Sequence, residues 1–404
     1  KALKIAAVVL VVLVVALWMR KAHYDAHYFD KYDPKAPLNV TVLETEELNA
    51  DAPEKAYSIT KFTFDGYGGE KVPTLMAMPK KADGKRMPAV VFLHGIGQNK
   101  NFLRELAPPF CQTGFMLLSF DQFMQGERKL PKGTSGLASL HAFRQRPWKT
   151  VNETRRLIDY LAERPDVDAR RIYLVGASYG AITGSTVLAK DKRLRAGVMV
   201  YGGGDLGKLV DSVATRLGVG AAFGFIDGKT FNPEKPPLPK LTPGQNRICG
   251  AVIKCATPLV RYFGGAMDPI HYVDKIAPTP VYFQNGKFDV LVPAAAGEAL
   301  QQAAREPKEI IWYESDHVGI DLAQTNVVLR DGLTWLLDFD AGSGLTAAGY
   351  VGVPLTKRYA AGSGSSFGWD PAAAPLASFD RYGPDDLLRD GHYGYDGTFL
   401  LDVA

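Results

Sequence analysis

A serine between two glycines is the residue of this chain best suited to covalent chemistry. The segment Gly176-Ala-Ser178-Tyr-Gly180 matches the pattern G-x-S-x-G. In that pattern a sharp strand-to-helix turn strains the backbone at the serine and exposes its hydroxyl, and the glycines avoid collisions with neighbouring backbone. An apolar run at 172–175 predicts the strand, and the residues after Gly180 predict the helix. Ser178 is therefore the candidate nucleophile.

A serine hydroxyl needs a base that removes its proton during attack. His317 follows a predicted late strand, in a loop of polar and small residues, and is the candidate base and later acid. Asp289 lies in a turn that follows another strand, where its carboxylate can orient the imidazole. Asp316 competes for that role, but it adjoins the histidine and cannot easily turn back onto the ring.

Two backbone amides are candidates for the oxyanion hole. The N–H of Tyr179 opens the helix after the nucleophile, and the N–H of Ile96 lies in the loop His94-Gly95-Ile96-Gly97, where glycines allow close approach. Preorganised donors of this kind are typically worth ~3 kcal/mol each. His94 is expected to brace the loop. Asp121 and Arg128 follow a strand end and either reach the site or form a salt-bridged loop, the reading that we favour.

A doubly wound sheet is expected to position these residues. Predicted strands and helices alternate along the chain, which indicates a mostly parallel sheet with an antiparallel start. The expected strands cover 57–64, 72–78, 87–93, 115–120, 172–175, 196–201, 279–284 and 309–313. The expected helices cover 99–110, 148–163, 294–305 and 327–339, in addition to the helix after Ser178.

These motifs, in this order, resemble the α/β-hydrolase superfamily, closest to its dienelactone-hydrolase and acetyl-xylan-esterase-like branch, over residues 58–340. The resemblance implies an α/β-hydrolase fold in which Ser178, Asp289 and His317 form the triad. It also implies a serine hydrolase that acts on a small-molecule carboxylic ester through an acyl-enzyme, without metal or cofactor. Thioester and amide hydrolysis use the same triad and stay open. The insertion at about 205–275 is expected to form a cap with an apolar roof.

An apolar run at 5–19 predicts a membrane anchor. Lys4 precedes the run, and Arg20 and Lys21 follow it. We expect an uncleaved, single-pass transmembrane helix over residues 1–22, a juxtamembrane linker over 23–56 and a hydrolase domain over 57–340. The domain is expected on the periplasmic or extracellular side. His23 and His27 could share a helix face and hold a metal, but an interfacial aromatic cluster is the favoured reading.

Charge and cysteine content indicate which partners and cross-links to expect. The net charge is +4 with no long basic run, so no nucleic-acid partner is expected. Among the three cysteines, Cys249 and Cys255 form either a disulfide or two free thiols.

The segment 341–404 is rich in glycine and alanine, yet aromatic residues recur through it. Because a disordered linker rarely carries so many rings, we expect it to dock on this protein's own surface or on a partner. This tail and the anchor support an alternative function, an accessory or scaffold subunit of a membrane complex.

Overall fold

The structure, a computed structural model, describes residues 2–49, 51–52, 55–80, 86–217, 242–319 and 322–342, and short segments at 367–369, 377–380, 390–393 and 399–401. The chain divides into two compact units, Lys1–Val328 and Leu329–Ala404. The first unit contains every predicted site residue.

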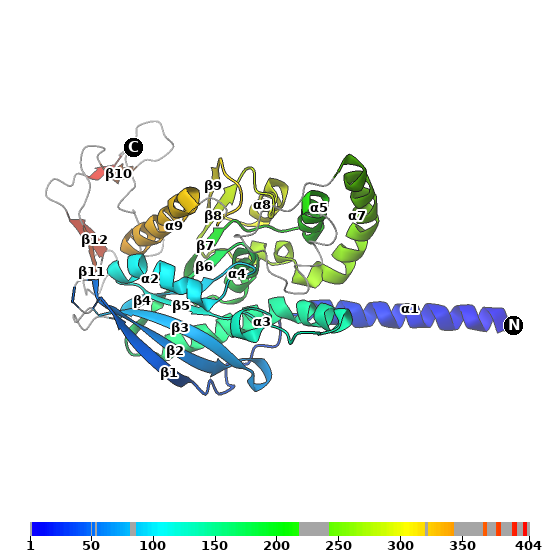
Figure 1. Ribbon diagram of the computed structural model, residues 1–404, viewed down its shortest axis with the longest axis horizontal. Coiled ribbons are helices and arrows are strands. Elements are labelled where there is room, and N and C mark those ends of the chain that lie inside the picture. The colour runs from blue at the N-terminus through cyan, green and yellow to red at the C-terminus, as the bar shows by residue number, and fades with distance from the viewer. Residues whose placement is uncertain are drawn as a thin grey trace. The chain divides into compact units, whose positions relative to one another are not determined.

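A nine-stranded sheet forms the centre of the first unit, in the order β1-β2-β3-β5-β4-β6-β7-β8-β9 (Figure 1). Its strands are β1 Thr41–Leu48, β2 Tyr57–Asp65, β3 Lys71–Pro79, β4 Met87–Leu93, β5 Met116–Phe120, β6 Val167–Ala177, β7 Leu194–Val200, β8 Val281–Gly286 and β9 Lys308–Tyr313. The pairs β1–β2, β2–β3 and β3–β5 are antiparallel, and the pairs that join β5, β4, β6, β7, β8 and β9 are parallel. The predicted mostly parallel sheet with an antiparallel start is confirmed.

Helices connect the parallel strands, as the alternating pattern predicts. Their bounds are α1 Ala2–Ala26, α2 Leu103–Gln112, α3 Gly136–Glu163, α4 Tyr179–Lys190, α5 Leu206–Leu217, α7 Pro243–Gly264, α8 Ala294–Ala303 and α9 Leu322–Gly342. The start of α3 differs from the expected residue 148. The hydroxyl of Ser135 caps the helix by accepting from the amide of Ala138 at 3.3 Å, and Pro147, which lacks a backbone donor, does not end it.

The core lies around the central strands. Every residue of β5 is buried, and so is every residue of β4 after Met87. Such continuous burial is typical of strands that are covered on both faces. The carboxyl ends of the parallel strands share one edge, where ligands bind in sheets of this kind. The residues that follow β4, β6, β8 and β9 therefore meet at that edge.

Helix α1 extends away from the rest of the first unit (Figure 1). Its side chains from Val8 to Arg20 are exposed. Within the part of the chain that the structure describes, no helix combines the length and the apolar character needed to cross a bilayer. The predicted transmembrane helix over residues 1–22 is thus not supported, since the apolar run between Lys4 and Arg20 is shorter than the ~20 residues of a typical span.

The predicted linker over residues 23–56 is partly built into the domain. It contains β1, which pairs with β2, and it contributes Tyr28 and Phe29 to the core, each 2% exposed. The hydroxyl of Tyr28 donates to the carbonyl of Arg144 on α3 at 2.5 Å. Seven of the eight residues of β1 are exposed, and no period-2 alternation of apolar and polar residues marks this edge strand in the sequence.

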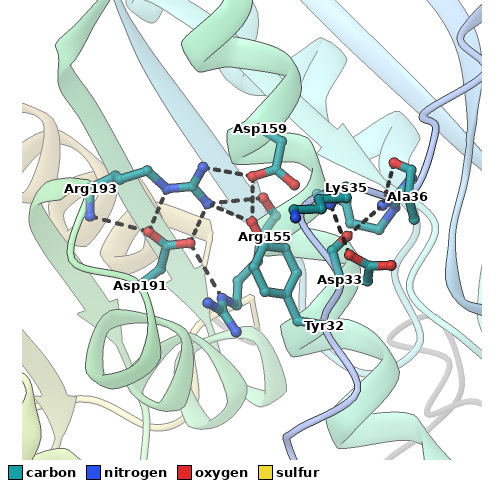
Figure 2. Close-up of polar contacts among 9 residues, drawn as sticks. Tyr32, Asp33, Lys35, Ala36, Arg155, Asp159, Asp191 and Arg193 are labelled. Carbon is teal, nitrogen blue, oxygen red and sulfur yellow. Dashed lines mark hydrogen bonds and ion pairs between the residues drawn. The ribbon is translucent and has the colours of Figure 1, made fainter.

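A network of charged residues holds the segment after α1 against α3 (Figure 2). The hydroxyl of Tyr32 donates to Oδ1 of Asp159 at 2.5 Å, and Nη1 of Arg193 donates to the same oxygen at 2.6 Å. The guanidinium of Arg155 lies 3.6 Å from the centroid of the Tyr32 ring, and Asp191 accepts from Arg193. Burial and the hydrogen bond to Asp159 raise the pKa of Tyr32 to about 12.

The predicted cap is described in part. It contains α5 and α7, whereas residues 218–241 lie outside the described residues. Arg261 on α7 binds Asp205 next to α5, with Nη2 2.9 Å from Oδ2. Cys255 is an exposed free thiol. The disulfide alternative is therefore wrong: Cys249 and Cys255 both lie on α7, and six residues of helix rise by ~9 Å, too far for a disulfide.

Within the second unit, the predicted tail forms short strands. They are β10 Phe367–Trp369, β11 Ala377–Asp380, β12 Asp390–Tyr393 and β13 Phe399–Leu401. β10 pairs antiparallel with β13, and β11 pairs antiparallel with β12. Several of the recurring aromatic residues lie in these strands, and the others lie outside the described residues. Docking of the tail on a surface stays a prediction.

Candidate active site

Ser178 occupies the turn between β6 and α4. Its backbone has φ +55° and ψ −117°, a conformation that costs a non-glycine residue free energy and is typical of functional turns. A Cβ atom at Gly176 would lie 2.3 Å from the carbonyl oxygen of Gly180, and one at Gly180 would lie 1.9 Å from that of Leu93. Both glycines of the motif are therefore required by backbone packing.

The hydroxyl of Ser178 begins a continuous chain of hydrogen bonds. Its Oγ lies 2.9 Å from Nε2 of His317, and Nδ1 of the same ring lies 2.6 Å from Oδ2 of Asp289. An ionised carboxylate only accepts, so Nδ1 donates and Nε2 of a neutral ring is left to accept the proton of Ser178. His317 is 6% exposed and Asp289 is 1% exposed. The structure thus brings together the three residues of the predicted triad.

Adjacent strand ends produce this geometry. Ser178 follows β6, Asp289 follows β8 and His317 follows β9, and β7 lies between the first two of these strands. The loops after β8 and β9 are joined, because the amide of Phe288 donates to the carbonyl of Ser315 at 3.0 Å. Tyr201, directly after β7, packs its ring edge-on against His317, with centroids 5.8 Å apart.

The two candidate carboxylates have separate roles. Oδ1 of Asp289 accepts from the amides of Leu291 and Val292, both at 2.8 Å, which leaves Oδ2 for the histidine ring. Oδ1 of Asp316 instead accepts from the amides of Val290 at 3.0 Å and His317 at 2.7 Å. Asp316 therefore holds the loop, and Asp289 orients the ring.

The predicted oxyanion loop lies beside Ser178. β4 and β6 are parallel neighbours with Leu93 opposite Gly176, so the residues that follow each strand meet. A Cβ atom at Gly95 would lie 3.2 Å from Cβ of Ser178. Tyr179 is the first residue of α4, where amides have no acceptor within the helix.

Two of the three amides from Gly95 to Gly97 already have acceptors. The amide of Gly95 donates to Oε1 of Gln98 at 3.0 Å, and that of Gly97 donates to Oε1 of Gln125 at 2.8 Å. Within the described residues, no acceptor binds the amide of Ile96. The predicted donor is therefore the amide that the loop leaves available.

His94 braces this loop from a fully buried position, as expected. Its Nδ1 lies 3.0 Å from the carbonyl of Gly95, and its own carbonyl accepts from Nε2 of Gln122 at 2.7 Å. Burial lowers the pKa of His94 to about 4. A neutral imidazole at this position adds no charge to the loop.

Sequence reasoning missed the glutamines Gln98, Gln122 and Gln125. The only hint in the sequence was that Gln122 and Gln125 lie between Asp121 and Arg128, a segment that was interpreted as a salt-bridged loop. That reading is correct for the charged residues. Oδ2 of Asp121 is 3.0 Å from Nζ of Lys100, and Nη1 of Arg128 is 2.7 Å from Oε2 of Glu153.

Three other histidines make contacts outside the triad. His141 is exposed on α3, with Nε2 2.7 Å from Nε2 of Gln145 on the same helix. The rings of His23 and His27 are 4.5 Å apart, and Nδ1 of His27 is 3.0 Å from Oδ2 of Asp30. In the residues that the structure describes, no group of three or more His, Cys, Asp or Glu side chains is arranged to hold a metal ion.

Comparison with known proteins agrees with this architecture. A model of the dienelactone hydrolase family matches residues 72–223. An acetyl xylan esterase from Paenibacillus sp. R4 is similar with a TM-score of 0.53 and 18% identity, over 78% of this chain and 92% of that chain. Acetyl xylan esterase 1 from Thermoanaerobacterium sp. JW/SL YS485 is similar with a TM-score of 0.51 and 17% identity, over 77% of this chain and 93% of that chain.

The chain has the α/β-hydrolase fold. The predicted resemblance to the superfamily and to its dienelactone-hydrolase branch is confirmed. The residues that the family model matches include Ile96, Ser178 and Tyr179, whereas Asp289 and His317 follow the matched segment. The uncharacterized protein YfhR of Salmonella typhi is 24% identical over 307 residues, which are 74% of this chain and 87% of that protein.

Proposed function

We propose that this protein is a serine hydrolase that acts on carboxylic esters. The observation that carries the proposal is the unbroken chain of hydrogen bonds from Ser178 through His317 to Asp289, with distances of 2.9 and 2.6 Å. The available amide of Ile96 beside the nucleophile supports it, and so does the match to a hydrolase family. The esterase names of two structural neighbours favour an ester over a thioester or an amide.

The proposed reaction has two steps. His317 takes the proton of Ser178 as Oγ forms a bond to the carbonyl carbon, and the carbonyl electrons move onto oxygen. The amides of Ile96 and Tyr179 stabilise that oxyanion. When the carbonyl reforms, the bond to the alcohol oxygen breaks and His317 Nε2 protonates the leaving alcohol. Water then attacks the acyl-enzyme, with the same ring as base, and releases the acid and Ser178.

The environment of the triad suits these roles. Asp289 is almost fully buried and already accepts two backbone amides, so its carboxylate is held for the imidazolium that forms. Tyr201 against the histidine ring limits ring rotation. The reaction requires only side chains and backbone donors of this chain and one water.

Labelling with a fluorophosphonate probe tests the proposal. The wild-type protein is expected to be labelled and to hydrolyse short-chain p-nitrophenyl esters, and Ser178→Ala is expected to lose both. Ser185→Ala is the matched control, because that hydroxyl, on the helix after Ser178, donates to the carbonyl of Ala181 at 2.8 Å. Labelling that persists in Ser178→Ala would falsify the assignment. A panel of acyl chain lengths, with a thioester and an anilide, then defines the substrate class.

A membrane location remains part of the proposal. It is motivated by the exposed apolar side chains of α1, such as Leu17 at 65% and Trp18 at 60%. We expect the protein to sediment with membranes and to be released by detergent, with the catalytic domain accessible to protease from the periplasmic or extracellular side. Recovery in the supernatant without detergent would rule this out.

The accessory-subunit hypothesis makes a different prediction. If the protein serves to assemble a complex, removal of residues 343–404 should abolish capture of a defined partner while Ser178→Ala leaves capture and cellular function intact. If it serves as the esterase that we propose, Ser178→Ala should reproduce the phenotype of complete loss of the protein.

A further inference from the structure

We propose that Gln125 is a positioning residue for the oxyanion hole, an inference that rests on the proposed esterase activity. Its carboxamide oxygen accepts the amide proton of Gly97 at 2.8 Å, from a segment 28 positions away in sequence. By fixing that peptide, Gln125 leaves the amide of Ile96 as the one that faces the substrate. Gln125 itself touches no reacting atom.

The loop of Ile96 needs an external acceptor for this purpose. Gly97 has φ +85°, and Gly95 lies on the other side of Ile96, so the loop has little conformational preference of its own. The carbonyl of Gly95, in the same peptide as the amide of Ile96, lies 3.0 Å from Nδ1 of His94, and the next peptide, with the amide of Gly97, is held by Gln125. Rotation of that next peptide would shift Ile96 relative to Ser178. A hydrogen bond at each end limits that freedom, through Gln98 at Gly95 and Gln125 at Gly97.

Gln125 is held rigidly enough to act as such a support. Its side chain is 4% exposed, and its amide donates to the carbonyl of Gln122 at 3.0 Å. The next residue, Gly126, has φ +56°, and a Cβ atom there would lie 2.1 Å from Oδ1 of Asp121. The turn that carries Gln125 is thus fixed by a buried carboxylate.

The carboxylate of Asp121 is itself bound by residues of two segments. Asp121 is fully buried and accepts from the amide of Lys100 at 2.9 Å, from its Nζ at 3.0 Å and from the amide of Glu127 at 2.9 Å. Gln122 in the same turn donates to the carbonyl of His94. The turn after β5 and the loop after β4 are therefore joined by several direct hydrogen bonds, and the one that Gln125 accepts is at Gly97, next to Ile96.

The competing explanation is that Gln125 only fills and stabilises the interior. A structural role of that kind predicts a lower unfolding temperature with an unchanged kcat for the folded fraction. Positioning of the oxyanion donor predicts a loss that is specific to the transition state, since the substrate ground state gains little from that amide.

The test compares two buried glutamines in the full-length protein. Gln125→Met removes the acceptor and keeps the side-chain length. Gln301→Met is the matched control, because Gln301 is also 4% exposed and donates one hydrogen bond, to Oδ1 of Asn285 at 2.9 Å. For each variant, kcat, KM, the inhibition constant of a boronic acid that forms a tetrahedral adduct on serine, and the unfolding temperature are measured.

We expect Gln125→Met to lower kcat by ~10–100-fold, less than the loss of a whole oxyanion donor, with KM within about twofold. The boronic acid should bind more weakly by a similar factor, and Gln301→Met should change neither quantity. Equal effects of the two variants on kcat, or a rise in KM at constant kcat, would overturn the proposal.

A second variant covers the case in which Gln125→Met does not fold. Gln125→Asn keeps a buried amide and shortens its reach by one methylene, so the same selective loss of kcat is expected; wild-type kcat in that variant would overturn the proposal. Failure of the esterase assignment is recognised separately: in that case Ser178→Ala retains wild-type turnover, whatever the glutamine variants do.

Discussion

Gly180 packs so tightly against Leu93 that a Cβ atom on the glycine would lie 1.9 Å from the carbonyl oxygen of the leucine. This contact joins the first turn of α4 to the end of β4. It therefore sets the distance between Ser178, which precedes Gly180, and the proposed oxyanion loop, which follows Leu93. Backbone on both sides leaves no flexible atom to move aside.

Gly180→Ala should therefore separate the two halves of the site. A displacement of ~1 Å can cost ~100-fold in rate, and overpacking of this kind costs ~1–3 kcal/mol of unfolding free energy. Ester hydrolysis and urea unfolding measure the two effects. Gly136→Ala is the control, since a Cβ atom there meets nothing within 4 Å. Wild-type activity in Gly180→Ala would show that α4 can shift without harm.

Asp289→Asn should lower kcat by ~10³–10⁴-fold with little change in KM, because an amide at this position favours the wrong histidine tautomer. Steady-state kinetics on a short-chain ester measure the loss. Asp316→Asn is the matched control. Its Oδ1 accepts only from backbone amides, which an asparagine oxygen can still do. Losses of equal size in the two variants would contradict the assignment of Asp289 as the orienting acid.

His94 should make the stability of the fold depend on pH. Its pKa is lowered from 6.5 to about 4 by burial, so the unfolded chain binds a proton more readily than the folded one between these values. The contribution of the neutral His94 to the free energy of unfolding is then fully present above about pH 6.5. It is lost as the pH falls toward 4, by up to ~3 kcal/mol. The free energy of unfolding of His94→Gln, measured with urea, should change less steeply with pH over this range. Replacement of the exposed His141 by Gln should leave the pH dependence as in the wild type.

Arg156 should hold the segment after α1 to the domain. Its guanidinium donates to the carbonyls of Asp65 and Pro37, each at 2.7 Å, and to those of Asp33 and Ala36, each at 3.2 Å. A lysine ammonium cannot reproduce this planar arrangement.

We expect Arg156→Lys to lower the free energy of unfolding by about 2–4 kcal/mol, since several carbonyls lose a charged donor. Arg170→Lys is the control: Arg170 is half-exposed and pairs with Asp168, so a change below ~1 kcal/mol is expected. Chemical unfolding measures both variants, and similar stabilities would show that the segment is held by its apolar residues alone.

The sequence determined the parts of this protein that depend on local geometry. Ser178 could be recognised because the strained turn and both of its glycines lie within five consecutive residues, and the central strands and the presence of the helices between them followed from apolar runs and their alternation. The order of Ser178, Asp289 and His317, each after a predicted strand, was enough to bring the three together, since parallel strands share a carboxyl edge.

Only the tertiary structure decided which of the competing groups lies in position to act. Oδ2 of Asp289 lies 2.6 Å from Nδ1 of His317, whereas Oδ1 of Asp316 binds two amides of the loops. Ile96 keeps an available amide because Gln98 and Gln125 bind the amides of its neighbours. The edge strand β1 likewise depends on its pairing with β2. Hydrogen bonds between distant segments leave no period in the sequence, so the acceptor that a given donor finds is settled by packing alone.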